Sequence, residues 1–237
     1  MLRSIALLYG DKLGALDGDI GHVKDFYFDD RNWAVRYVVA DTGSWLTGCQ
    51  VLISPHSLGR LAPAGKILCM NLTRKQIENS PSIESHKPVS RQYEEEYHRY
   101  YGWPYYWQGD ALWGMSNVPI LTLPSPLLSI QPAAASGPQP AREDAHLRST
   151  QAVNGYHLQA RDGTVGNVCD FMMDDQTWAI GQLVIKTGHR LSGREVQIPT
   201  NNIDRISYED STVFADLTSE AVEQSPAHYK AAVAAVV

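Results

Sequence analysis

The stretch DGDIGHVKDFYFDD at residues 17–30 returns as DGTVGNVCDFMMDD at residues 162–175. The two stretches lie 145 positions apart, and the same offset aligns residues 10–81 with residues 155–226 without a gap. Of the 72 aligned positions, 26 are identical, whereas about four would match by chance in chains of ordinary composition. The sequence therefore predicts a duplicated domain.

Each copy has the pattern of short antiparallel strands. Each copy contains an Asp-Gly dipeptide, at 17–18 and 162–163, and both residue types tolerate the positive φ that a tight turn needs. Alternating residues, β-branched residues and aromatic residues then favour a pleated strand. The strands predicted in the first copy are 23–28, 33–40, 51–53 and 66–70.

A short helix closes the predicted domain. Thr73 and Gln76 have the spacing of a capping box, which would start one or two helical turns. Short strands about ten residues apart, followed by a helical turn, are typical of a small barrel. The predicted fold class is therefore all-β, with two small barrels in tandem.

The residues that the two copies share resemble the PRC-barrel domain. The resemblance rests on DGDIGHVKDFYFDD, YVVADTG and VLISP in the first copy, and on DGTVGNVCDFMMDD, LVIKTG and VQIP in the second. This domain occurs in the cytoplasmic part of the photosynthetic reaction-centre H subunit and at the C-terminus of the ribosome-maturation factor RimM. The resemblance implies two PRC-type barrels. It implies neither a photosynthetic nor a ribosomal role, because we expect no N-terminal transmembrane helix like that of the H subunit and no separate N-terminal domain like that of RimM.

Five segments make up the expected organisation of the chain. The two barrels flank an aromatic helical segment, a Pro/Ala-rich flexible linker follows that segment, and a short apolar tail ends the chain. The predicted bounds are 1–81 for the first barrel, 82–117 for the aromatic segment, 118–150 for the linker, 151–228 for the second barrel and 229–237 for the tail.

Composition narrows the function classes. A net charge of −6 argues against nonspecific electrostatic binding of nucleic acid. No apolar run approaches the ~20 residues that span a bilayer, so we expect no transmembrane segment. The three cysteines form no CxxC pair, which favours a reducing cytoplasm.

Catalytic and metal-binding patterns are weak. No histidine or cysteine recurs at the offset, so the sequence excludes a duplicated metal or nucleophile site, and we expect no cofactor. An enzyme with a site in one copy only, around His22, His56 or Cys49, stays open as a minor alternative. The acidic pairs at 29–30 and 174–175 suggest calcium ligands, but no EF-hand pattern surrounds them, and aspartates that cap a hairpin turn are the favoured interpretation.

The densest aromatic cluster of the chain lies between the copies. SRQYEEEYHRYYG (90–102) predicts a short helix that begins after Ser90 and ends at Gly102, with its tyrosines on one face. So many rings need a cover, because an exposed stripe of them would aggregate. Three covers are open: the chain's own barrels, a protein partner or second copy, and a membrane interface. The candidate partner-binding residues are Tyr93, Tyr97, Tyr100, Tyr101, Trp103, Tyr105, Tyr106, Trp107 and Trp113.

The favoured function is a non-catalytic scaffold or adaptor that binds a protein partner or a second copy of itself. The alternative, which rests on the resemblance to the H subunit, is a peripheral component at the cytoplasmic face of a membrane that supports electron or proton transfer.

Overall fold

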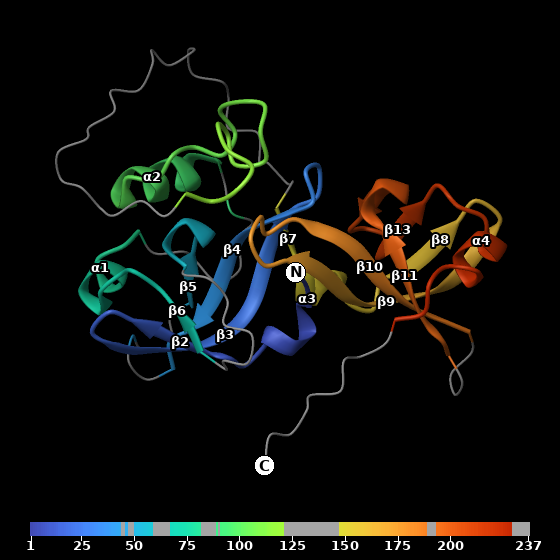
Figure 1. Cartoon of the computed structure of the whole chain (residues 1–237), viewed down its shortest axis with the longest axis horizontal. Helices are drawn as coiled ribbons and strands as arrows, with labels where there is room; N and C mark the ends of the chain where they lie inside the picture. Colours follow the sequence, from blue (N-terminus) through green and yellow to red (C-terminus); the bar gives the residue numbers. More distant parts are fainter. Residues whose placement is uncertain are drawn as a thin grey trace. The chain divides into compact units, whose positions relative to one another are not determined.

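A computed structural model describes residues 1–43, 46, 50–58, 67–81, 89, 91–120, 147–188 and 193–228 (Figure 1). The chain forms two compact units, and neither unit is continuous in sequence. Unit 1 contains Met1, Leu7–Gln151 and Asp174–Ala179, and unit 2 contains Leu2–Ala6, Ala152–Met173 and Ile180–Val237.

Unit 1 is built on one mainly antiparallel sheet with the strand order β5-β4-β3-β2-β6. Strands β2 and β6 pair in parallel, and β7 pairs with β3 away from this path. The strands are β2 (Lys12–Ala15), β3 (Gly18–Asp29), β4 (Ala34–Asp41), β5 (Gln50–Ile53), β6 (Ile67–Cys69) and β7 (Leu147–Ser149). The short helical elements are η1 (Ala6–Leu8), whose first residue belongs to unit 2, η2 (Pro55–Ser57), α1 (Arg74–Glu78) and α2 (Arg91–Tyr101).

Unit 2 repeats this plan, with the strand order β11-β10-β9-β8-β13-β12. Strands β8 and β13 pair in parallel, as β2 and β6 do in unit 1, and β1 pairs with β9. The strands are β1 (Leu2–Ser4), β8 (His157–Ala160), β9 (Gly163–Asp174), β10 (Ile180–Thr187), β11 (Glu195–Pro199), β12 (Ile203–Ser207) and β13 (Thr212–Ala215). The short helical elements are α3 (Thr150–Val153), whose first two residues belong to unit 1, η3 (Thr200–Asn202) and α4 (Ser219–Glu223).

The predicted all-β class is confirmed at the level of secondary structure, since two β-sheets dominate the described residues. Closure of either sheet into a barrel is not found there, because the pairing runs as an open path with β5 and β6, or β11 and β12, at its ends. All four strands predicted in the first copy are present, and β3 is longer than expected because it begins at Gly18. The capping box is present too: Thr73 accepts from the Gln76 amide and donates its own amide to the Gln76 side chain.

The hairpin turns confirm that the two copies share one local structure. Asp29 accepts hydrogen bonds from the amides of Arg31 and Asn32, and Asp174 accepts them from Gln176 and Thr177. Each turn ends in a tryptophan with positive φ, 50° at position 33 and 59° at position 178. These two aspartates therefore cap turns, as the favoured interpretation of the acidic pairs predicts.

The segment between the copies is only partly described. Of the predicted linker at 118–150, residues 121–146 lie outside the described residues, while Leu147–Ser149 form strand β7. The predicted tail at 229–237 also lies outside them. No described helix has the length and apolar character needed to cross a bilayer.

Candidate functional site

Residues 91–113 fold over strands β4 and β5 of unit 1; we call this segment the aromatic cover (Figure 1). The Tyr97 hydroxyl donates to the Leu52 carbonyl of β5, and the Tyr37 hydroxyl of β4 donates to Glu94 of α2. The helix ends at Tyr101, and Gly102 takes a φ of 71°, as the sequence predicts. Of the covers that the sequence left open, the structure shows the chain itself, because this segment packs on the sheet of unit 1.

The nine candidate residues do not form one exposed surface. Five of them are at most 5% exposed: Tyr97, Tyr101, Trp103, Tyr106 and Trp113. The others reach the surface to different degrees: Tyr100 is 42% exposed, and Tyr93, Tyr105 and Trp107 are half-buried. Only these four offer ring surface to a partner while the cover is in place.

A buried carboxylate organises the inner side of the cover. Glu94 is fully buried, and one of its oxygens accepts from Tyr37 (2.9 Å) and from Tyr106 (2.6 Å). Its other oxygen lies 3.0 Å from the guanidinium of Arg91. Burial raises the pKa of both phenols, with the Glu94 charge as the next cause, so both tyrosines stay protonated as donors.

Two histidines lie in the same cluster. His98 is buried, with Nδ1 2.9 Å from the Pro104 carbonyl and Nε2 3.0 Å from the Tyr37 hydroxyl. His56 is fully buried, with Nδ1 2.9 Å from the Ile120 carbonyl, and its Nε2 has no hydrogen-bond partner in the described part of the chain. Burial lowers the pKa of His98 to about 3, aided by His56, and burial also lowers the pKa of His56. Both rings are therefore neutral near pH 7.

Arg36 provides the second charged anchor beneath the cover. It is 1% exposed, pairs with Asp29 (3.2 Å) and donates to the Leu112 carbonyl (2.6 Å). Its guanidinium carbon lies 4.0 Å from the ring centre of Tyr106 and 5.0 Å from that of Trp113. The planar cation thus joins the sheet to the cover by ionic, hydrogen-bond and cation–π contacts.

This cluster belongs to the first copy alone. At the offset of 145, Arg36 corresponds to Gly181, Tyr37 to Gln182 and His56 to Asn201. A residue that the shared fold requires should recur at the offset, whereas a residue with a role in one copy need not. The cluster was not predicted from the sequence. The two copies nevertheless differ at positions 36 and 37, and this difference could have indicated a role for Arg36 and Tyr37 in the first copy alone.

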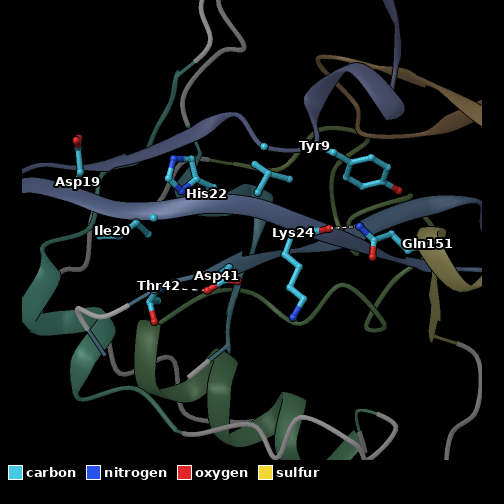
Figure 2. A pocket seen from close by; sticks show the side chains of 12 residues that line it. Tyr9, Asp19, Ile20, His22, Lys24, Asp41, Thr42 and Gln151 are labelled. Carbon is cyan, nitrogen blue, oxygen red and sulfur yellow. Dashed lines mark hydrogen bonds between the residues drawn. The ribbon is translucent and has the colours of Figure 1, made fainter. Parts of the chain in front are cut away.

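A second candidate, an open depression of about 630 Å³, lies on another part of unit 1 (Figure 2). Its lining includes His22 and Lys24 from β3, Asp41 from β4, Tyr9 and Gln151. It does not include His56, so the structure does not bring His22 and His56 into one site. Cys49 lies outside the described residues, and no group of three His, Cys, Asp or Glu side chains that could hold a metal occurs among residues 1–43, 50–58, 67–81, 91–120, 147–188 and 193–228.

The cover should make unit 1 sensitive to acid. A histidine whose folded pKa is below its unfolded value of 6.5 favours folding fully above pH 6.5, and this contribution declines as the pH falls toward the folded pKa. We expect the free energy of unfolding to fall below pH 6.5 by up to about 1.4 kcal/mol per pH unit for each buried ring. Urea unfolding between pH 7.5 and 4.5, followed by tryptophan fluorescence, measures this slope.

A matched pair of variants assigns the slope to the cluster. His98→Gln removes a buried titrating ring and should flatten the slope, and His157→Gln, a change at an exposed histidine of unit 2, is the matched control. An equal slope in the wild type and in His98→Gln would contradict the assignment.

In comparisons with known proteins, no protein-family model matches the chain and no curated protein matches it.

Proposed function

We propose that the chain is a non-catalytic scaffold of two PRC-barrel-type units, in which the outer rings of the aromatic cover capture a protein partner. The observation that carries the proposal is the arrangement of Tyr105 and Trp107 on the outer side of the cover. Their ring centres lie 4.8 Å apart at an interplanar angle of 27°, and the Arg91 guanidinium lies 4.3 Å from the Trp107 ring centre. Tyrosine, tryptophan and arginine are the residues most often found at the energetic centre of protein interfaces.

The buried cluster supports this role because it holds the outer rings in place. Arg91 connects Trp107 to the buried Glu94, and Glu94 in turn accepts from Tyr37 of the sheet. Rings fixed in this way lose little conformational freedom when a partner binds. Because the cluster is absent from the second copy, the proposal gives the two units different roles on one shared fold.

Surface substitutions test the proposal without removing the buried cluster. A tagged chain carrying Tyr100→Ala, Tyr105→Ala and Trp107→Ala should recover at least about thirtyfold less partner from its native cell, since each hot-spot ring contributes about 2 kcal/mol or more. Tyr208→Ala, a change at an exposed ring of unit 2, is the matched control. Circular dichroism checks that the variants remain folded. Equal recovery by the triple variant and the control would refute the proposed surface.

Barrel closure is part of the same proposal. Strands β11 and β12 are the two ends of the strand path in unit 2, yet only η3 separates them in the chain. Such a connection supports a sheet that curls back toward its own first strand. Slow hydrogen exchange at the β12 amides that do not face β13 would favour closure, and fast exchange there would count against it.

We also place the protein in the cytoplasm. The support is chemical: among the described residues Cys69 and Cys169 are free thiols, and free thiols persist in a reducing compartment.

A further inference from the structure

Each unit contains a strand from the other half of the chain. Strand β7, which precedes the second copy, pairs with β3 of the first copy. Strand β1, which precedes the first copy, pairs with β9 of the second copy. Both strands have the sequence Leu-Arg-Ser, and they lie at the same offset of 145 as the repeat itself. The exchange of strands is therefore reciprocal, since each half of the chain gives one strand and receives one.

The two exchanged strands are bound by the same chemistry. In unit 1 the Ser149 hydroxyl donates to Asp25 at 2.5 Å, and in unit 2 the Ser4 hydroxyl donates to Asp170. Each carboxylate also accepts from the main-chain amide two residues after the serine, at 3.1 Å in unit 1 and at 2.9 Å in unit 2. Asp25 and Asp170 correspond at the offset and are only 9% and 7% exposed. Each of these nearly buried carboxylates therefore depends on donors from the other half of the chain.

The hairpin turn of the second copy is a further segment of this kind. Residues 174–179 belong to unit 1, although most of β9 and all of β10, the strands that this turn connects, belong to unit 2. In unit 1 the Trp178 carbonyl accepts from the Val35 amide at 2.9 Å, and the Thr177 carbonyl accepts from the Trp113 indole N–H at 2.8 Å. Because β9 and β10 hold the two ends of the turn together, unfolding of unit 2 would withdraw these acceptors from unit 1.

Each unit thus interrupts the other along the chain. Leu2–Ala6 of unit 2 are separated from the rest of that unit by residues 7–151, and Asp174–Ala179 of unit 1 are separated from the rest of unit 1 by residues 152–173. If the intervening unit were unfolded, each segment would be tethered by a flexible loop, and closing such a loop costs free energy that rises with its length. A three-residue strand such as β1 has little binding energy to oppose that cost. It would leave β9, and Asp170 would lose its donors.

We propose that the two units form one cooperative folding unit, in which a substitution or a ligand that changes the stability of one unit changes the stability of the other equally. The exchanged strands and the shared hairpin turn carry this coupling. A partner that binds unit 1 then stabilises unit 2 as well, because a ligand that binds only the folded chain shifts the whole unfolding equilibrium. The proposal goes beyond the proposed scaffold role and does not depend on which partner the aromatic cover binds.

Two probes distinguish the units during urea unfolding of the full chain. All six tryptophans fall within the residue ranges of unit 1, so tryptophan fluorescence follows unit 1. Pulsed hydrogen exchange at the β10 amides follows unit 2. In the wild-type chain the two transitions should coincide, as they do for a two-state protein. Separate midpoints would overturn the proposal.

Substitutions within unit 2 exclude an accidental coincidence of the two midpoints. Gly166→Ala places a methyl group against the Lys186 carbonyl, and both residues belong to unit 2. The equilibrium constant of unfolding measured by tryptophan fluorescence should rise about a hundredfold or more, by the same factor as the constant measured at β10. Ser4→Ala, which removes one donor from Asp170, is a milder variant and should raise both constants about fivefold or more.

A surface change in the same unit is the matched control. Asp204→Ala alters an exposed side chain of unit 2 and should change both constants by about twofold at most. If the constant for unit 2 rises in Gly166→Ala or Ser4→Ala while the constant for unit 1 stays at its wild-type value, the units unfold independently and the proposal is wrong.

Discussion

Arg36→Ala should lower the free energy of unfolding of unit 1 by about 3–5 kcal/mol, the range found when one member of a buried ion pair is removed. Arg36 is 1% exposed, and its removal leaves the Asp29 carboxylate, which is 3% exposed, without its 3.2 Å ionic partner. It also takes the donor from the Leu112 carbonyl and the cation from the faces of Tyr106 and Trp113. Urea unfolding followed by tryptophan fluorescence reports on this region directly.

The neighbouring Arg31 provides the control for this change. Arg31 is exposed at the hairpin turn, so Arg31→Ala should change the free energy of unfolding by no more than about 0.5 kcal/mol. A loss below about 1 kcal/mol for Arg36→Ala, or equal losses for the two variants, would show that Arg36 does not anchor the cover.

Gly21→Ala and Gly166→Ala should each cost about 3 kcal/mol or more, because the new methyl group would overlap a backbone carbonyl that has little room to move. The overlap is with the Asp41 carbonyl in unit 1 and with the Lys186 carbonyl in unit 2. Gly21 and Gly166 correspond at the offset of 145, and each lies where the long strand passes close to the next one. Gly21 also has a φ of 135°, whereas Gly166 is not among the glycines with positive φ, so the loss should be at least as large in unit 1 as in unit 2.

Two other glycines separate steric overlap from backbone strain. Gly10 and Gly155 also correspond at the offset, have φ of 79° and 93°, and have no atom within 4 Å of an added methyl group. Alanine there should cost only the strain of positive φ, about 1–2 kcal/mol. Thermal unfolding of the four variants gives the comparison, and equal losses at positions 10 and 21 would contradict the close approach.

Much of the local structure was readable from the sequence because it depends on neighbours in the chain. The turns at Asp29 and Asp174, the capping box at Thr73 and the helix end at Gly102 all follow from residues within a few positions of one another. Because the domain is repeated, each turn and strand could be predicted from two related sequences.

The exchange of strands was harder to predict because pairing partners are a long-range property. A tripeptide such as Leu-Arg-Ser is too short to stand out in a chain of this length, and its own pattern does not say which sheet it joins. The identity of residues 2–4 with residues 147–149 at the repeat offset becomes informative only once Asp25 and Asp170 are seen to bind both serines.

The sequence predicted that the aromatic rings of the candidate site are covered, but it did not predict which residues cover them. The number of rings between Tyr93 and Trp113 indicated that something must cover them, and burial of rings is what the structure shows. The residues that receive them, Arg36 and Tyr37, lie on a distant strand, where the apolar pattern gave no reason to expect charge. The second copy has Gly181 and Gln182 at the corresponding positions, and only this difference between the copies indicates that Arg36 and Tyr37 have a role outside the shared fold.

The account rests on the packing of α2 against unit 1, and hydrogen–deuterium exchange of the isolated full chain tests it most directly. A helix of 11 residues does not persist alone in water, so its amides are protected only if the cover is packed. We expect the amides from Glu95 to Tyr101 to exchange as slowly as those of Val38 and Val39 in β4. Complete exchange of α2 at the first time point, with β4 still protected, would contradict the account.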